Sequence, residues 1–364
     1  GEGGGETSKL IGDEFFGWTE GMDTTPLPIE LVDYWVDKLA TEATDGTDLS
    51  VTTVAGPATV SIDQAQTDAH GRNYRQLIQK FLLGAVTFSQ PTNDYLQTDF
   101  ANTLGQEGTK KYGAGEHDWD EAFGYYGAAR NNNDFTDNEA AGKSGRDGWK
   151  NGYNDINADG TIDVRSEYNL GISQNCAKRD RLDIDDDGVG ETNLSKEAFD
   201  AFVLGRHVIS EATNSGTMSA SQQAVVTAQA EIAGMAMEKC VAATVIHYIN
   251  DVIIDMGNFS DGSFADASNF KDLGKHWSEM MGFALGLQFS PYSPFRADAD
   301  SLSNLKLIYS RFGHGPVLAD GSQAGTPATG TAQEAVDAYI ALLQGNRTLL
   351  QEAYGFDSAV VEVW

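Results

Sequence analysis

The spacing of apolar residues predicts a chain built almost entirely of helices. In "PIELVDYWVDKLATEA", residues 28–43, apolar side chains recur every three to four positions after a proline that marks a helix start. A second helix, over residues 71–90, is expected to end at Pro91 because proline cannot donate the next backbone hydrogen bond. The expected helices cover residues 28–43, 71–90, 117–129, 195–213, 219–256, 267–287, 300–311 and 331–354.

Several segments depart from this helical spacing. Residues 50–60 are β-prone and predict one short hairpin, and residues 1–14 begin with a Gly/Glu-rich stretch that predicts a flexible N-terminal spacer. Residues 130–194 are rich in Gly, Asp and Asn and predict a long polar insertion, and residues 257–266 predict a second loop. We therefore expect an all-α fold, in one domain over residues 15–364, interrupted by this insertion.

The charge of the chain limits its partners. The net charge is −30 and the pI is about 4.3, so the surface repels nucleic acid and anionic lipid headgroups and attracts cations. No run of about 18 apolar residues occurs, which predicts that no segment spans a membrane. We expect the chain to start downstream of a removed leader and lipid-anchoring cysteine, because a Gly/Glu spacer such as residues 1–14 would follow them.

The insertion contains two segments with the spacing of calcium loops. These are "DINADGTID", residues 155–163, and "DIDDDGVGE", residues 183–191. Each has oxygen-bearing side chains at positions 1, 3, 5 and 9 and a glycine at position 6, where a calcium loop turns sharply. With position 7 included, the candidate calcium ligands are Asp155, Asn157, Asp159, Thr161 and Asp163 in the first loop, and Asp183, Asp185, Asp187, Val189 and Glu191 in the second.

The two loops resemble EF-hand, dockerin and thrombospondin-type loops, with one departure. The bidentate glutamate that an EF-hand has at position 12 is replaced by Ser166 in the first loop and Leu194 in the second. Glu167 and Glu197 are alternatives at shifted positions. We expect calcium to have a structural role here, because so polar an insertion buries too little apolar surface to order itself.

The two cysteines of the chain, Cys176 and Cys240, are 64 positions apart and leave two alternatives open. They could form one disulfide in an extracytoplasmic protein, or they could remain reduced. No Cys-x-x-Cys occurs, which argues against a thiolate zinc site.

A histidine–carboxylate motif occurs twice. Residues 115–120 read "GEHDWD" and residues 274–279 read "GKHWSE", and both fit Gly-x-His-x-x-Asp/Glu. On a helix, a carboxylate three or four positions after a histidine lies on the same face, and imidazole with carboxylate suits iron and similar metals. The candidate iron ligands are His117, Asp120 or Glu121, His276 and Glu279.

The two motifs, with the stretches "HDWDEAFGYYG" and "KHWSEMMGFALGLQF" around them, resemble the signature of the imelysin-like proteins. The resemblance is strongest to the lipoprotein branch called domain of unknown function 4856, and it extends over residues 15–355. It implies two pseudo-symmetric helical bundles within residues 15–364, with the insertion at about 130–194 as the least family-like part. His117 and Asp120 match the family's His and Glu positions, but Asp120 is shorter than glutamate, so Glu121 stays an alternative.

The resemblance implies a function in bacterial iron uptake rather than catalysis. It suggests a lipoprotein in the periplasm or on the outer membrane of a Gram-negative bacterium, which binds iron or an iron chelate and works with a TonB-dependent receptor or an iron permease. The alternative is a calcium-stabilised cell-surface protein that binds a peptide, a glycan or a receptor. An imelysin-type peptidase is a third option, which the absence of a His-Glu-x-x-His motif disfavours.

Overall fold

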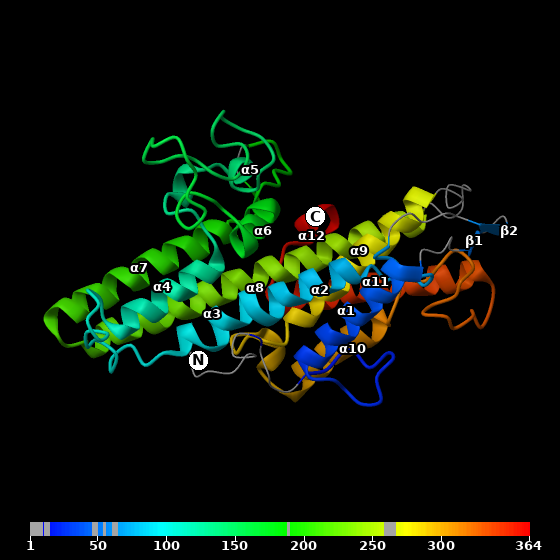
Figure 1. Ribbon diagram of the computed structural model, residues 1–364, viewed down its shortest axis with the longest axis horizontal. Helices are drawn as coiled ribbons and strands as arrows, with labels where there is room; N and C mark the ends of the chain where they lie inside the picture. Colours follow the sequence, from blue (N-terminus) through cyan, green and yellow to red (C-terminus); the bar gives the residue numbers. More distant parts are fainter. Residues whose placement is uncertain are drawn as a thin grey trace. The chain divides into compact units, whose positions relative to one another are not determined.

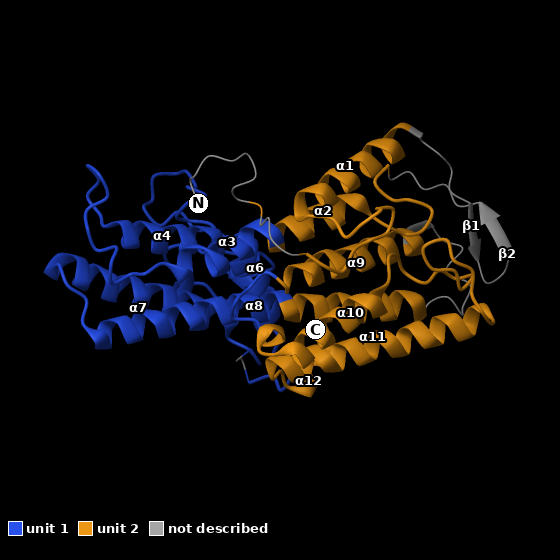
Figure 2. Ribbon diagram, turned by 90° about the horizontal axis from the view of Figure 1, so that it is seen from below, with its two compact units in different colours: residues 1–9, 85–241, 289–293 blue, residues 10–84, 242–288, 294–364 orange. Residues whose placement is uncertain are grey.

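The computed structural model describes residues 10, 15–45, 50–53, 56–59, 65–187, 190–257 and 267–364. Within these residues the chain is all-α apart from one small hairpin (Figure 1), as the sequence predicted. The expected spacer, residues 1–14, lies outside the described residues except for Leu10. The described residues form two compact units (Figure 2), unit 1 with residues 85–187, 190–241 and 289–293, and unit 2 with the other described residues.

Unit 2 contains the N-terminal and C-terminal helices and the second histidine motif. Its hairpin is antiparallel and pairs Ser50 with Thr59, which confirms the hairpin predicted within residues 50–60. The elements of unit 2 are α1 (Pro28–Asp45), β1 (Ser50–Thr53), β2 (Gly56–Thr59), α2 (Tyr74–Leu82), α9 (Ala267–Gly286), α10 (Ala299–Phe312), α11 (Ala332–Tyr354) and α12 (Ser358–Val363).

The closest helix packing in unit 2 is between α2 and α9. Two glycines make it possible, because a Cβ atom added to Gly286 would lie only 2.9 Å from the Cα atom of Gly84. A Cβ atom on Gly282 would lie 2.7 Å from the Cβ atom of Lys80. Trp35 and Trp277 are fully buried in the same core. Small residues on α9 therefore let α2 approach the helix that carries the second motif.

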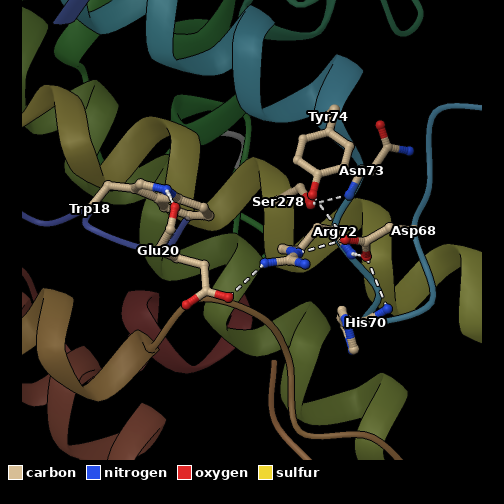
Figure 3. A network of polar contacts seen from close by, with 8 residues as sticks. All are labelled: Trp18, Glu20, Asp68, His70, Arg72, Asn73, Tyr74 and Ser278. Atoms are coloured by element: carbon tan, nitrogen blue, oxygen red, sulfur yellow. Dashed lines mark hydrogen bonds and ion pairs between the residues drawn. The ribbon is translucent and has the colours of Figure 1, made fainter. Parts of the chain in front are cut away.

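A buried polar network fixes the start of α2 against α9. Asp68 accepts hydrogen bonds from Arg72 Nε at 2.7 Å and from the Tyr74 hydroxyl at 2.9 Å, so the buried guanidinium has a charged partner. Burial, followed by the negative charge of Asp68, raises the pKa of Tyr74. The backbone N–H of Asn73 donates to Ser278, which lies inside the second motif. Figure 3 draws the network, which comprises Trp18, Glu20, Asp68, His70, Arg72, Asn73, Tyr74 and Ser278.

Unit 1 contains the first histidine motif and the insertion. Trp119 of α4 and Phe202 of α7 form its core, and the Trp119 indole N–H donates to the Phe202 carbonyl at 2.8 Å. The helix α8 belongs to unit 1 up to Val241 and to unit 2 beyond it. The elements are α3 (Ser89–Asn93), α4 (Ala114–Tyr126), α5 (Asp137–Ala140), α6 (Gly171–Asp180), α7 (Leu194–Ser215) and α8 (Ala220–Gly257).

Two predicted boundaries are wrong. The helical path that starts at α2 does not stop at Pro91 but continues to Asn93, through a π-helical segment at Leu83–Phe88. Pro91 lies in the first turn of α3, where a missing N–H costs little. The helix expected over residues 117–129 also starts earlier than predicted, because α4 begins at Ala114 and places His117 one turn inside it.

The insertion is more ordered than its composition predicts. It contains α6, which buries Ile172 and Cys176. No periodic apolar pattern in the sequence predicts this helix. Asp180, at the end of α6, is fully buried and accepts hydrogen bonds from the backbone N–H groups of Leu194 and Ser195. This carboxylate therefore satisfies two of the free N–H groups at the start of α7.

Among the described residues, one helix, α8, is long and apolar enough to cross a membrane by length and composition. In its most apolar window, 67% of the residues are buried inside the structure, as in the core helix of a folded domain.

Candidate functional site

The second motif histidine contacts carboxylates on a neighbouring helix. His276 Nδ1 lies 2.8 Å from Asp255 Oδ2, and His276 Nε2 lies 3.9 Å from Asp251 Oδ2. Asp251 and Asp255 are four positions apart on α8, so they share the face that α9 meets. Two carboxylates of α8 thus flank one half-buried imidazole of α9.

A second imidazole completes this cluster, which we call the α8–α9 cluster and define as His247, Asp251, Asp255 and His276. His247 Nε2 lies 3.4 Å from Asp251 Oδ2, on the preceding turn of α8. The ring of Tyr248 stacks on His276, with centroids 6.1 Å apart. The cluster places imidazole and carboxylate groups, donors that divalent transition metals accept, along the contact between α8 and α9, with Asp255 at one nitrogen of His276 and Asp251 nearer the other.

The carboxylates change the acidity of the imidazole. Burial lowers the pKa of His276. The hydrogen bond and charge of Asp255, together with the charge of Asp251, raise it by more than burial lowers it, so the pKa lies above its ordinary value of 6.5. The anionic surroundings that would attract a metal ion therefore also attract a proton.

Glu279, which the sequence paired with His276, has other partners. Its Oε1 lies 3.4 Å from Lys80 Nζ, and its Oε2 lies 3.9 Å from Lys275 Nζ. The side chain is almost fully buried, with the two lysines balancing its charge. The carboxylate that contacts His276 at 2.8 Å is Asp255 of α8, whereas Glu279 contacts lysines, and its role as a metal ligand stays a prediction.

In the first motif, the carboxylate that contacts the histidine is that of Glu121. His117 Nε2 lies 3.2 Å from Glu121 Oε1, while Asp120 forms two hydrogen bonds to Arg206, at 2.7 and 3.2 Å. The His117 ring stacks on Tyr112, 5.3 Å away. Glu121 is thus the carboxylate next to the imidazole, and Asp120 is neutralised by a cation.

Glu116 caps the N-terminus of α4. Glu116 Oε2 accepts the backbone N–H of Gly113 at 2.8 Å, and its Oε1 accepts hydrogen bonds from Arg206 and Ser210, both at 2.7 Å. Burial raises the pKa of Glu116, but these donors outweigh it, so its pKa lies below the ordinary value. Arg206 therefore joins two carboxylates of the first motif helix to α7.

The first calcium loop folds around its own acidic residues. The backbone N–H groups of Asp159 and Gly160 donate to the carboxylate of Asp155 at 3.1 and 2.8 Å. Asp159 also accepts the Thr161 N–H at 2.9 Å, and Gly160 has a φ of +84°, which permits the tight turn. These contacts curl the loop with Asn157 inside the turn, where its side-chain oxygen accepts the Asp159 N–H.

Glu167, one position beyond the expected one, closes this loop without facing its centre. It is 1% exposed, and its two oxygens accept the backbone N–H groups of Ile156 at 3.1 Å and Asp163 at 2.9 Å. The Asp163 carboxylate turns instead to Arg165 Nε at 3.1 Å. Glu197, the other alternative, lies in the first turn of α7.

The second calcium loop brings its carboxylates closest together. Asp183, Asp185 and Asp187 each offer one oxygen, and these oxygens lie within 4.8 Å of one another. Oxygens on opposite sides of a Ca²⁺ ion lie at most about 5 Å apart, because each bond measures 2.3–2.6 Å. Glu191 accepts the Ile184 N–H at 3.0 Å, and the candidate ligand Val189 lies outside the described residues, as does Gly188.

Cys176 and Cys240 form a disulfide within unit 1, which resolves the alternatives that the sequence left open. The bond joins α6 of the insertion to α8. It therefore ties the insertion to the main helices covalently.

Comparison with known proteins identifies one family. The model described as "Domain of unknown function (DUF4856)" matches residues 19–143, about a third of the chain, so the chain is similar to that family over this range. The matched range includes the first motif but ends before both calcium loops and the second motif. No curated protein and no solved structure matches the chain.

Proposed function

We propose that this chain is an extracytoplasmic metal-binding protein that captures iron, or an iron chelate, for bacterial iron uptake. One observation carries the proposal, namely the convergence of two imidazoles and two carboxylates in the α8–α9 cluster. Mixed nitrogen and oxygen donors suit iron, manganese and zinc better than calcium. His276 and Asp255 would be the principal ligands, with Asp251 and His247 beside them.

The insertion would bind calcium for structural reasons. The close carboxylates of Asp183, Asp185 and Asp187 fit the oxygen spacing that the ion needs. The first loop, with Asp155, Asn157, Asp159, Thr161 and Asp163, has the same donor chemistry in the same sequence spacing. Calcium would offset the mutual repulsion of these carboxylates and hold the insertion in one conformation.

Two features support an extracytoplasmic location. Disulfides persist in oxidising compartments, and Cys176 and Cys240 are joined. Calcium loops are most useful where calcium is abundant. A lipid anchor upstream of residue 1, and delivery to a TonB-dependent receptor or an iron permease, belong to the same proposal through the resemblance to imelysin-like lipoproteins.

Iron binding to the purified protein tests the proposal. We would measure Fe²⁺ affinity by anaerobic calorimetry, and metal content after purification without chelators, for wild type, His276→Ala and His207→Ala. His207 is a matched control because it also has a carboxylate four positions on, Glu211 at 3.4 Å, but its side chain is exposed. We expect His276→Ala to lose at least tenfold in affinity and His207→Ala to stay within threefold. The proposal fails if His276→Ala melts earlier than wild type but binds Fe²⁺ equally well.

A calcium-stabilised interaction protein is the second candidate, for one reason. Apolar side chains of the insertion are exposed, at 52% for Ile156, 59% for Val164 and 44% for Ile184, and they could contact a partner. The same calorimetry separates the two functions, because an interaction protein would bind Fe²⁺ no better than its His276→Ala variant.

A further inference from the structure

A cavity in unit 1 lies beside the first motif, between α4 and α7. Its volume is about 550 Å³, within the range of small-molecule sites. Its walls are aromatic, with Trp119 and Phe123 from α4 and Phe199 and Phe202 from α7. Figure 1 shows these two helices side by side. Such walls suit a flat apolar group.

Three arginines line the same cavity, Arg130, Arg165 and Arg206. The chain has 54 acidic and only 24 basic residues, so three guanidinium groups around one cavity are an unusual local concentration of cations. The one acidic residue in the lining, Asp120, is already paired in bidentate fashion with Arg206. The lining therefore carries a net positive charge.

The guanidinium groups differ in how far they are engaged. Arg206 is held by Asp120 and Glu116. The Arg165 side chain is 87% exposed and touches only the surface carboxylate of Asp163. Arg130 has no side-chain hydrogen bond or ion pair to any residue that the structure describes. Arg130 is thus available to an incoming anion, and Arg165 would have to exchange its exposed contact with Asp163 for one with the anion.

A glycine keeps one wall of the cavity open. No atom lies within 4 Å of the position that a Cβ atom on Gly124 would occupy, although Gly124 is in the middle of α4. Glycine inside a helix is less stable than alanine, so neither the backbone conformation nor close packing explains its presence. The open space is on the cavity side, since Gly124 is part of the cavity lining.

We propose that this cavity binds a small aromatic carboxylate. The ring would lie against Trp119 and Phe123, and the carboxylate would meet Arg130 and Arg165, where guanidinium groups bind carboxylates in a planar, two-bonded fashion. Arg206 would stay with Asp120 and Glu116, which neutralise it, and would not contact the bound carboxylate. This inference does not depend on the metal-binding proposal, because none of the residues of the α8–α9 cluster takes part.

The test uses 2-naphthoate as the probe and its uncharged amide, 2-naphthamide, as the comparison. Affinity is measured by calorimetry with the full chain, for wild type, Gly124→Leu, Arg130→Gln and Arg296→Gln. We expect wild type to bind naphthoate at least tenfold more tightly than naphthamide. Gly124→Leu fills the cavity and should abolish binding of both, whereas Arg130→Gln should remove most of the preference for the charged probe. Arg296→Gln, a control at an exposed arginine outside the cavity, should change neither affinity.

A further variant guards against loss of folding. Val203 lines the cavity and is 53% exposed, so Val203→Glu adds a repelling charge without disturbing the core. It should weaken naphthoate at least fivefold and leave naphthamide within twofold. The proposal is overturned if naphthoate does not bind, if the amide binds equally well, or if Val203→Glu and Arg130→Gln leave naphthoate affinity unchanged. Equal weakening of both probes by Val203→Glu would also overturn it, because the site would then not recognise charge.

Discussion

The helices α4 and α9 carry the same sequence motif in two units, and they share its packing residues. Trp119 and Trp277 are both fully buried, and each indole N–H has an acceptor, the Phe202 carbonyl in one case and the Tyr339 hydroxyl in the other. Gly115 and Gly274 both allow a neighbouring segment to approach, since a Cβ atom there would lie 2.6 Å from Thr103 and 2.9 Å from the Gly71 carbonyl. The motif glycine, and a tryptophan that follows each histidine within two positions, therefore have the same packing role in both helices.

The neighbouring helices bring different charged groups to the two motif helices. Around α4, Arg206 binds both Glu116 and Asp120, and the neighbouring cavity has an arginine rim. Around His276 of α9, two aspartates of α8 face the imidazole. The residue before each histidine also differs in charge, because it is Glu116 in the first motif and Lys275 in the second. The repeat thus preserves packing, while the neighbouring helices decide whether a half favours anions or cations.

Calcium removal should give the largest difference between the two units, because it should destabilise unit 1 and leave unit 2 unaffected. Both candidate loops lie in unit 1, and a ligand present at 100 times its dissociation constant stabilises the state it binds by about 2.7 kcal/mol per site. We expect a chelator to lower the melting temperature of unit 1 and to make residues 130–194 sensitive to protease. Asp159→Ala and Asp187→Ala should each reproduce part of the loss.

The control for calcium is Asp147→Ala, which removes an exposed insertion carboxylate paired only with Lys150. It should leave both melting and cleavage unchanged. If chelator has no effect on wild type, the two loops do not depend on calcium, and the contrast between the units loses its metal component.

Neutralising a carboxylate should weaken metal binding at the second motif, in unit 2, but not at the first motif, in unit 1. Asp255→Asn removes the charge that faces His276 at 2.8 Å, so Fe²⁺ affinity should fall tenfold to a hundredfold, about 1.4–2.7 kcal/mol. Glu121→Gln removes the carboxylate beside His117 and should change it less than threefold. Equal losses from both substitutions, measured by calorimetry, would mean that the two halves bind metal alike.

Two glycines that follow the motif histidines, Gly124 seven positions after His117 and Gly282 six positions after His276, should respond to alanine with opposite signs. Gly282→Ala pushes a methyl group against Lys80 and the α2 backbone, and we expect it to lower the free energy of unfolding by about 1–2 kcal/mol. Gly124→Ala meets open space and should raise it by about 0.5–1 kcal/mol through helix propensity. Denaturant unfolding of both variants measures the difference, and a shared sign would show that the two helices are packed alike.

The acidic cap of α4 should give the smallest effect and a pH signature. The pKa of Glu116 is lowered by folding, so its stabilisation is complete above the unfolded value of 4.5 and is lost as pH falls through the folded value. Glu116→Gln should therefore cost about 1 kcal/mol at pH 7 and progressively less below pH 4.5. Lys275→Gln, at the matching position of α9, should show no such change in the acid range. A constant cost for Glu116→Gln down to pH 3 would contradict this account.

The sequence predicted the helices well because their apolar spacing is long and regular. It failed at Pro91, where a π-helical segment places the proline in a first turn, and at α6, which is too polar to show a periodic pattern. The disagreement in both cases is local, and the all-α architecture does not depend on it.

The candidate sites were harder to predict than the helices. The i to i+4 pair of His117 and Glu121 follows from helix geometry and was one of the two alternatives. Asp255 is 21 positions from His276 and on another helix, so no local pattern could name it. The same is true of the cavity, whose arginines come from α7, the end of α4 and the first calcium loop. Tertiary neighbours, which a single sequence does not reveal, decide the chemistry of each site.

The disulfide between Cys176 and Cys240 gives the two calcium loops different fates when the chain is cut. Residues 183–191 lie inside the covalent ring that the bond closes, whereas residues 155–163 lie outside it. A protease that nicks the second loop therefore leaves two pieces still joined, which migrate together on a gel until a thiol is added. A nick in the first loop divides the chain at once into an N-terminal and a C-terminal fragment, linked only by noncovalent contacts. The two loops, alike in sequence, thus differ in whether damage to them breaks the molecule.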